Sequence, residues 1–388
     1  MSTGGTIAAG VESLVEQVRH AHAHRIALRI VGSGTWLDGG RPSSATTMLN
    51  VAPLRGIVAY EPGDLTLTAL AGTTLAEIEA ATAAEAQWLT LDPFGAPNGT
   101  LGATVATSSW GPLASAFGTP RDHVLGCDFV TGAGEVIRAG GRVVKNVAGF
   151  DLVRLVTGAW GTLGALTEIT VRLRARPERD RTMIVIIDES SPANVAHSAW
   201  RWLRASDFTP LSAELLSPAL AAKLGFERRA CLAVRLGGNE AYVHGAAEAL
   251  ARLGELADAS RDVWRTLSQS EPSGAFVLRM SALPSRAGYL WEHAVAVAER
   301  HGGEAHVTLV RGVVRCVIPA TSDPASLAEL SQSLSAPPEG ITIVGERLPT
   351  ALWSSLDREL STYKLLDGVR DAFDPARIMN PTINGATT

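Results

Sequence analysis

A short apolar segment that runs directly into a glycine turn is the feature of this sequence that most limits its fold. Residues 26–31 (IALRIV) are apolar and partly β-branched, as in a buried strand, and GSGTW at 32–36 follows at once. Residues 10–24, just before, have helical periodicity, with Val11, Leu14, Val15 and Val18 on one face. Helix, strand and glycine turn in this order predict a layer of mixed helices and strands.

The turn at 32–36 has the composition of an anion-binding loop. Glycines leave successive backbone N–H groups open to a pyrophosphate, and Thr35 adds a hydroxyl donor. The pattern is not a Rossmann fingerprint, because GxGxxG is missing, and it is not a Walker A loop, because no GK[ST] follows. A simple turn between two strands explains this segment equally well.

A second unusual segment, residues 91–118, is rich in Gly, Ala, Ser, Thr and Pro and almost uncharged. Such small residues suit a backbone that packs closely against a flat ligand. A disordered linker is the alternative, but the segment holds too many apolar anchors for that: Phe94, Leu101, Val105, Trp110 and Phe117. We therefore favour the ligand-wrapping interpretation.

The rest of the chain predicts an α+β fold in two domains. In the first half we expect strands at 48–51, 64–72 and 166–173, a hairpin at 124–137, and a helix at 74–86 with Thr73 or Thr74 near its N-cap. The polar cluster RPERDR at 176–181 marks the boundary between domains 1–177 and 178–388. Beyond it we expect strands at 183–188, 230–238 and 315–320, and helices at 197–205, 241–256 and 289–303.

Composition excludes several classes of function. The 388 residues are 46% hydrophobic, so a large core can form, and a net charge of −5 argues against nucleic-acid binding. The three cysteines, Cys127, Cys231 and Cys316, form no CxxC pair, which excludes a zinc ribbon or iron–sulfur ligand set. Because no signal-like or membrane-spanning segment is recognisable, we expect a cytoplasmic protein, or one held at the inner membrane by a partner.

Three segments together resemble the FAD-binding domain of the vanillyl-alcohol oxidase (PCMH) type. They are GSGTW (32–36), PNGTLGATVAT (97–107) and KNVAGFDL, which runs on to GAWGTLG (145–164); the family patterns are GxGTS, GxTIGGxVAT and GYDLxxLxxGSxGTLG. The resemblance spans about residues 25–176. It implies a two-subdomain FAD-binding domain followed by an α+β cap domain, whose C-terminal tail returns toward the FAD domain.

The resemblance also implies which residues surround FAD. The candidates are Gly32, Ser33, Gly34, Thr35, Trp36, Thr100, Leu101, Gly102, Ala103, Thr107, Lys145, Gly161, Gly164 and Ile169. Lys145 is a candidate for neutralising phosphate, with a solvated lysine as its alternative. Some members of the superfamily tether FAD through a histidine or cysteine. Here no histidine occurs between His24 and His123, and we expect Cys127 to be buried, so we predict noncovalent FAD.

Within the superfamily, residues 145–168 are most similar to the E-type FAD-binding subunits of glycolate oxidase, as are the shorter segments 302–312, 345–353 and 373–381. Related D-2-hydroxy-acid dehydrogenases carry a metal-binding HxGDGNxH element. The nearest segment here, HGGEAH at 301–306, lacks its Asp and Asn, and we predict no metal. Oxidation of a 2-hydroxy acid needs a cation for the carboxylate and a base for the hydroxyl proton. The candidates are Arg279 and Arg311, each with an internal Asp or Glu as its alternative partner, and His306 as the base.

The resemblance therefore implies the FAD-binding subunit of a glycolate (2-hydroxy acid) oxidase or dehydrogenase. Its electrons would pass to a D-type flavoprotein subunit and an iron–sulfur subunit. Two alternatives remain open. One is a self-contained FAD oxidoreductase for a D-2-hydroxy acid such as D-lactate or for a sugar alcohol. The other is a structural subunit that has the FAD fold but little catalysis of its own.

Overall fold

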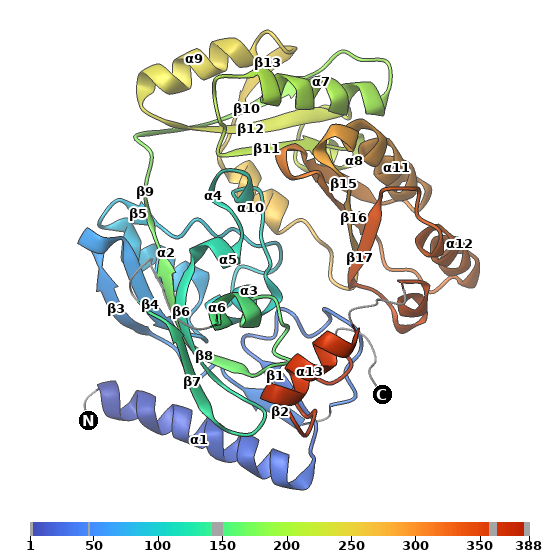
Figure 1. The fold of residues 1–388 in the computed structure, drawn as a ribbon. Helices are drawn as coiled ribbons and strands as arrows, with labels where there is room; N and C mark the ends of the chain where they lie inside the picture. Colours follow the sequence, from blue (N-terminus) through green and yellow to red (C-terminus); the bar gives the residue numbers. More distant parts are fainter. Residues whose placement is uncertain (1–2, 46, 142–149, 357–362, 384–388) are drawn as a thin grey trace. The chain divides into compact units, whose positions relative to one another are not determined.

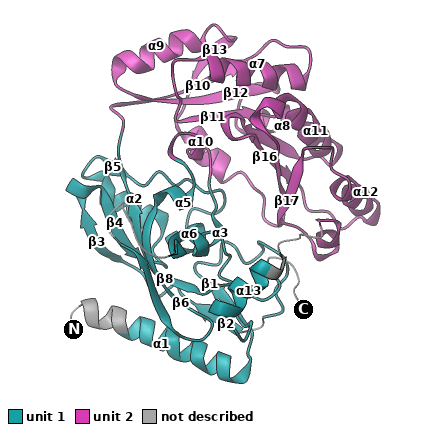
Figure 2. Ribbon diagram, viewed as in Figure 1, with its two compact units in different colours: residues 1–110, 118–176, 358–388 teal, residues 111–117, 177–357 magenta. Residues whose placement is uncertain are grey.

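The chain divides into two compact units, shown in different colours in Figure 2. The computed structural model describes residues 3–45, 47–141, 150–356 and 363–383. Unit 1 comprises residues 1–110, 118–176 and 358–388, and unit 2 comprises residues 111–117 and 177–357. The main boundary lies between Arg176 and Pro177. In addition, residues 111–117, from the first half of the chain, belong to unit 2, and residues 358–388, from the end of the chain, belong to unit 1.

A five-stranded antiparallel sheet forms the centre of unit 1 (Figure 1). Its strands, in spatial order, are β3 (Ile57–Glu61), β4 (Thr66–Leu70), β8 (Ala165–Arg172), β6 (Val124–Val130) and β7 (Val136–Gly140). The expected hairpin is β6 and β7, which pair directly. Phe129 and Ile169, both fully buried, belong to the apolar cluster of this sheet.

A second, smaller layer of unit 1 is built on the parallel pair β1 (Leu28–Val31) and β2 (Thr47–Asn50). Helix α1 (Thr3–His24) packs Leu14 and Val18 against this pair, in one cluster with Met379 near the end of the chain. Met379 also forms a parallel bridge to Leu28. The last residues of the chain thus extend this layer.

Short helices and turns complete unit 1. They are η1 (Pro62–Asp64), α2 (Leu75–Ala83), α3 (Leu101–Thr107), α5 (Pro120–His123), α6 (Leu152–Val156) and α13 (Tyr363–Phe373), with the short pair β5 (Gln87–Trp88) and β9 (Arg174–Ala175). Since residues 101–107 form a helix with Leu101 and Val105 fully buried, the disordered-linker alternative for this segment is wrong.

Unit 2 contains an eight-stranded sheet in which every neighbouring pair is antiparallel. The spatial order is β13 (Glu255–Ala259), β10 (Arg179–Ile186), β12 (Cys231–Gly238), β11 (Ser212–Leu216), β15 (Glu304–Thr308), β16 (Val313–Ile318), β14 (Phe276–Ser281) and β17 (Thr342–Arg347). The helical elements are α4 (Ala114–Phe117), α7 (Pro192–Ala205), α8 (Pro218–Lys223), α9 (Glu240–Leu250), α10 (Asp262–Ser268), η2 (Pro284–Arg286), α11 (Ala287–Arg300), η3 (Leu309–Arg311), α12 (Pro324–Ser335) and η4 (Thr350–Leu356).

The two faces of the eight-stranded sheet differ in chemistry. Because side chains alternate along a strand, Leu215 and Val307 point to one face and Glu214 and His306 to the other. The first face belongs to the large apolar cluster around the fully buried Trp291 of α11. The second face carries buried charged and polar side chains, and it is therefore the part of unit 2 in which chemistry is expected.

The helix predicted at 241–256 is longer than the observed helix α9. The periodicity predicts a helix over 241–256, but α9 ends at Leu250 and residues 255–259 form the edge strand β13. Gly254 lies between them, where an added Cβ would come within 2.1 Å of the Ile186 carbonyl oxygen. This close approach of β10 to the connection is a tertiary constraint, which a local periodicity does not reveal.

The start of α2 offers a test of the local sequence interpretation. Thr74 is its N-cap: the hydroxyl accepts from Glu77 N at 3.2 Å, and the Glu77 carboxylate accepts from Thr74 N at 2.8 Å. We expect Thr74→Ala to lower the free energy of unfolding by about 1 kcal/mol, whereas Thr74→Ser retains the cap. Urea denaturation followed by circular dichroism measures both; equal stability of the two variants would contradict this role.

Candidate functional site

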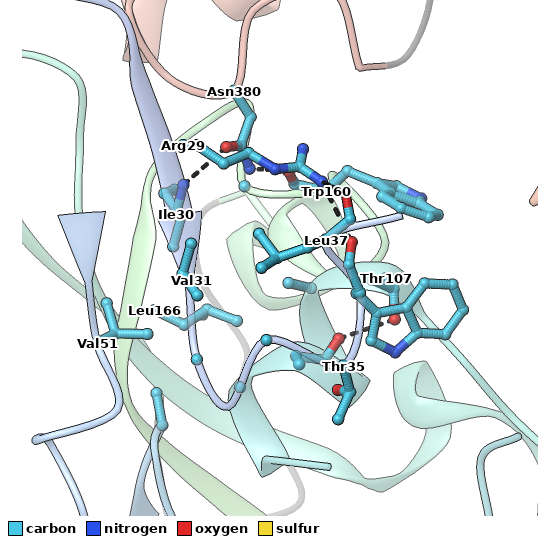
Figure 3. A pocket seen from close by; sticks show the side chains of 18 of the residues that line it. Arg29, Ile30, Val31, Thr35, Leu37, Val51, Thr107, Trp160, Leu166 and Asn380 are labelled. Atoms are coloured by element: carbon cyan, nitrogen blue, oxygen red, sulfur yellow. Dashed lines mark hydrogen bonds between the residues drawn. The ribbon is translucent and has the colours of Figure 1, made fainter. Parts of the chain in front are cut away.

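Unit 1 contains a pocket with about 650 Å³ of empty space, including open solvent at its mouth. Its walls come from β1 and the following turn, from α3, from the turn at 160–164 and from the C-terminal tail (Figure 3). Apolar side chains such as Ile30, Val51 and Leu166 alternate with small residues along it. This mixture of apolar side chains and small residues suits an organic ligand.

The glycine turn after β1 forms one wall of the pocket. Gly34 has φ +83°, a left-handed conformation that strains any residue with a Cβ. By contrast, Gly161 is required by the protein itself, because an added Cβ would lie 2.8 Å from both Asn380 Nδ2 and Ile30 Cδ1. The motifs suggest that their glycines make room for a ligand. At Gly161, however, a side chain is excluded by Asn380 and Ile30 of the chain itself.

Asn380 ties three remote segments together at the pocket. Its Oδ1 accepts from Ile30 N at 2.8 Å and its Nδ2 donates to Trp160 O at 2.7 Å. Its own backbone N donates to Leu28 O at 2.9 Å. Because Asn380 is buried, these bonds fix the edge of β1 relative to the 160–164 turn.

Arg29 gives the pocket its charge. Of the residues that line the pocket in the described part of the chain, Arg29 alone is charged. It is 8% exposed, and burial lowers the pKa of its guanidinium from the ordinary value. The pocket therefore has positive electrostatic character.

The predicted cofactor-binding residues fall into three groups. Those that line the pocket are Gly32, Gly34, Thr35, Trp36, Gly102, Ala103, Thr107, Gly161 and Gly164. Those that lie elsewhere are Ser33, in the same turn; Thr100, whose hydroxyl caps α3 by accepting from Ala103 N; and the fully buried Leu101 and Ile169. Lys145 lies outside the described residues.

Among the lining residues that the sequence analysis did not name are Trp160, Asn380 and Arg29. Trp160 lies inside a motif that was recognised, and Asn380 belongs to the closing segment 373–381, so both could have been found from the family pattern. Arg29 is a single arginine in a short apolar strand, and no local signal marks it.

In unit 2, His306 lies on the polar face of the eight-stranded sheet. Its Nδ1 is 2.8 Å from Glu214 Oε2, and Thr308 donates its hydroxyl to Glu214 Oε1 at 2.7 Å. All three side chains are buried. The carboxylate fixes the orientation of the ring and favours the tautomer with a proton on Nδ1.

Arg279 belongs to a cluster of charges on the same face. Arg279, Arg315 and His306 are direct cross-strand neighbours on β14, β16 and β15. Arg315 pairs with Glu271 and with Glu346 Oε2 at 2.5 Å, Arg347 with Glu271 Oε2 at 2.6 Å, and Arg279 Nη1 with Glu346 Oε1 at 3.4 Å. Burial raises the pKa of Glu346, but Arg315 and its neighbours Arg279 and Arg347 hold it below its ordinary value. The cluster combines three arginines with two glutamates.

Arg311 differs from its expected setting. The sequence predicts strand-like apolar surroundings, which is wrong: Arg311 is exposed at the end of the turn η3, and Gly312 with φ +61° reverses the chain there into β16. Its Nη1 donates to Ala114 O of α4 at 3.2 Å. Arg279 therefore has an internal partner in Glu346, and Arg311 has the Ala114 carbonyl oxygen among its contacts.

The remaining expectations concern cysteines, metals and membranes. Cys127, Cys231 and Cys316 are free and buried, and burial raises the pKa of each thiol to about 12. In the described ranges, no group of three or more His, Cys, Asp or Glu residues is placed to hold a metal ion. Among the helices that the structure describes, none combines the length and apolar character needed to cross a membrane.

Comparison with known proteins indicates that the chain binds FAD. Residues 6–140 match the family model of the FAD binding domain. Over 95% of the chain, the structure superimposes on alkyldihydroxyacetonephosphate synthase with a TM-score of 0.69 and 16% identity, covering 75% of that chain. Because this likeness covers 95% of the chain, it supports the predicted α+β fold for both units.

Three curated proteins show similarity to part of the chain. The chain is 44% identical over 168 residues to "Glycolate oxidase subunit GlcE" of Escherichia coli, covering 43% of this chain and 47% of that protein. It is 32% identical over 171 residues (44% of this chain) to "Glycolate oxidase subunit GlcD" of Bacillus subtilis, and 31% identical over 171 residues (44%) to a D-lactate dehydrogenase of Archaeoglobus fulgidus. The matches cover only 36% and 38% of the latter two proteins, so the chain spans less than half of each of these relatives.

The pocket residues suit FAD as a ligand. Arg29 Nη1 is buried without a hydrogen-bond partner in the described structure, as expected where a ligand supplies the acceptor. The turn at 32–36 offers backbone N–H groups for a diphosphate, and the apolar wall suits an aromatic ring system.

Gly34 provides a direct test of the turn. Gly34→Val places a β-branched residue at φ +83°, so we expect the turn to rearrange and flavin retention to be lost. The matched control is Gly63→Val, since Gly63 has open space around its Cβ position and does not line the pocket. Flavin absorbance per protein measures both, and an unchanged flavin content in Gly34→Val refutes a role of this turn.

Asn380 tests the tie at the pocket edge. Asn380→Ala leaves Ile30 N and Trp160 O without their partner, at a cost of about 1–3 kcal/mol for each buried group. We therefore expect weaker FAD binding and a lower unfolding midpoint of the flavin-free chain. Asn50→Ala is the control, because the Asn50 side chain accepts only from the nearby Ala52 N and is exposed. If both variants bind FAD like the wild type, the tie does not shape the pocket.

Proposed function

We propose that this chain is an FAD-dependent oxidoreductase that acts on the CH–OH group of a 2-hydroxy acid. In particular, we propose that it is the FAD-binding subunit of a glycolate oxidase or dehydrogenase, converting glycolate to glyoxylate. The support comes from the similarity to the glycolate oxidase subunits and D-lactate dehydrogenases. FAD, when bound, supplies the hydride acceptor for such an oxidation.

The division of labour between the units follows from their contents. We assign FAD binding to unit 1, which contains all the residues that line the pocket, Asn380 included, and substrate handling to unit 2. FAD is held noncovalently in this proposal. In support, the pocket lining within the described chain contains neither histidine nor cysteine.

The observation that carries the substrate class is the row of His306, Arg315 and Arg279 on adjacent strands of one sheet face. Arg279, whose side chain is 35% exposed, lies at the accessible part of a cluster with more arginines than glutamates, and it is the residue we assign to the substrate carboxylate. His306 takes the hydroxyl proton on Nε2, while Glu214 at Nδ1 stabilises the imidazolium that forms.

The electrons leave through partner subunits in this proposal. The three cysteines lie on three different strands and are buried, so they do not form a cluster site. We therefore propose a D-type flavoprotein subunit and an iron–sulfur subunit as partners. The similarity to both an E-type and a D-type subunit is consistent with an assembly of related chains.

The absorbance spectrum of the purified chain, recorded anaerobically with glycolate or D-lactate, tests the proposal. We expect a flavin spectrum that stays oxidised in the chain alone and bleaches when the D-type and iron–sulfur subunits are added. Bleaching in the chain alone would favour a self-contained dehydrogenase over a subunit. Bleaching in the complex that persists when this chain's FAD site is destroyed by Gly34→Val would favour a structural subunit.

Arg279 and His306 are tested by substitution in the complex. We expect Arg279→Met to raise KM for the 2-hydroxy acid by about tenfold or more, since a charge-assisted hydrogen bond is lost. His306→Gln should instead lower kcat by a factor on the order of 100. Arg300→Met is the control, because Arg300 pairs with Glu329 at an exposed helix surface. Normal kinetics in either test variant would exclude that residue.

A further inference from the structure

We propose that Arg29 is the residue that balances the charge of the FAD diphosphate, in addition to the backbone N–H groups of the glycine turn. Nothing in the recognised motifs assigns this residue a role. The proposal concerns the cofactor pocket alone, so it depends on FAD binding and is independent of which substrate the chain oxidises.

The guanidinium of Arg29 lies behind the turn that follows β1. Its Nη2 donates to the carbonyl oxygens of Trp36, Leu37 and Gly39, at 3.2, 3.4 and 3.3 Å (Figure 3 shows the side chain beside Leu37). All three bonds are donated by Nη2, which leaves Nη1 of the guanidinium for a different acceptor. Its Nη1 is buried and has no hydrogen-bond partner in the described structure.

The charge of Arg29 is not neutralised by the protein. No Asp or Glu among the described residues forms an ion pair with it, and desolvation is the one cause that shifts its pKa. A buried charge without a counter-ion is costly, and carbonyl dipoles offset only part of that cost. Buried arginines elsewhere in this chain are paired: Arg235 with Asp180 at 2.6 Å, and Arg315 with Glu271 and Glu346.

A bound anion supplies the missing counter-charge. The other lining residues are uncharged, so an anion entering the pocket meets no repelling carboxylate. A diphosphate suits the site, because arginine combines a fixed positive charge with planar N–H groups that match phosphate oxygens. The alternative is that Arg29 only stabilises the turn through its three hydrogen bonds to carbonyl oxygens. In that case its loss would weaken the binding of a phosphorylated and of an unphosphorylated ligand equally.

The test is the binding of ADP and of adenosine to the flavin-free full-length chain, measured by isothermal titration calorimetry. The two ligands share the nucleoside and differ in the diphosphate. We expect Arg29→Gln to weaken ADP binding by at least about tenfold and to leave adenosine binding within about twofold. Arg29→Lys, which keeps the charge, should weaken ADP binding less than Arg29→Gln does.

One control variant and one fallback measurement keep the outcome interpretable. Arg121→Gln removes another arginine of unit 1 that donates to a backbone carbonyl, Thr157 O, but does not line the pocket; it should bind both ligands normally. If Arg29→Gln does not fold, Arg29→Lys and the salt dependence of ADP binding to the wild type carry the test. Equal weakening of ADP and adenosine, or no weakening of ADP, overturns the proposal. Because neither ligand is oxidised, this result is separable from failure of the glycolate assignment.

Discussion

The two side-chain hydrogen bonds of Asn380 connect parts of the chain that are 350 and 220 residues apart in sequence. They hold β1, the 160–164 turn and the segment around Asn380 in one arrangement, and this arrangement encloses the pocket of unit 1. A site built in this way exists only when the segment around Asn380 is in place. Flavin binding must therefore stabilise the tail, because a ligand that binds only the folded form shifts the folding equilibrium toward it.

The buried arginines of the two units differ in how their charge is balanced. In unit 2, the buried Arg315 and Arg347 are matched by Glu271 and Glu346, so these two charges are balanced within the protein, and the more exposed Arg279 remains as the excess positive charge. In unit 1, Arg29 faces only carbonyl oxygens. The first arrangement is that of a self-sufficient core, and the second is that of a site whose electrostatics are complete only with an anion bound.

Local patterns predict what depends on local physics. The N-cap at Thr74, the hairpin of β6 and β7 and the strand β8 follow from residue order. The composition of the turn at 32–36, by contrast, suits an anion-binding loop and a simple turn equally well. Contacts between remote segments are not predictable in this way. Glu214, which orients His306, is 92 residues away in sequence, and nothing near either residue indicates the other. Residues 111–117 belong to unit 2 because of tertiary contacts, which their local sequence likewise does not reveal.

The glycines of the recognised motifs also divide by physical cause. At Gly161 the space is taken by Asn380 and Ile30, so a side chain there would disturb the fold of unit 1 before any ligand arrives. At Gly34 the constraint is backbone conformation, with φ +83°, and an added Cβ meets only Leu37 Cδ1 at an ordinary 3.6 Å. A motif that signals one cofactor in sequence is thus a mixture of positions that build the pocket and positions that contact its contents. Stability and flavin affinity, measured on the same variants, distinguish the two.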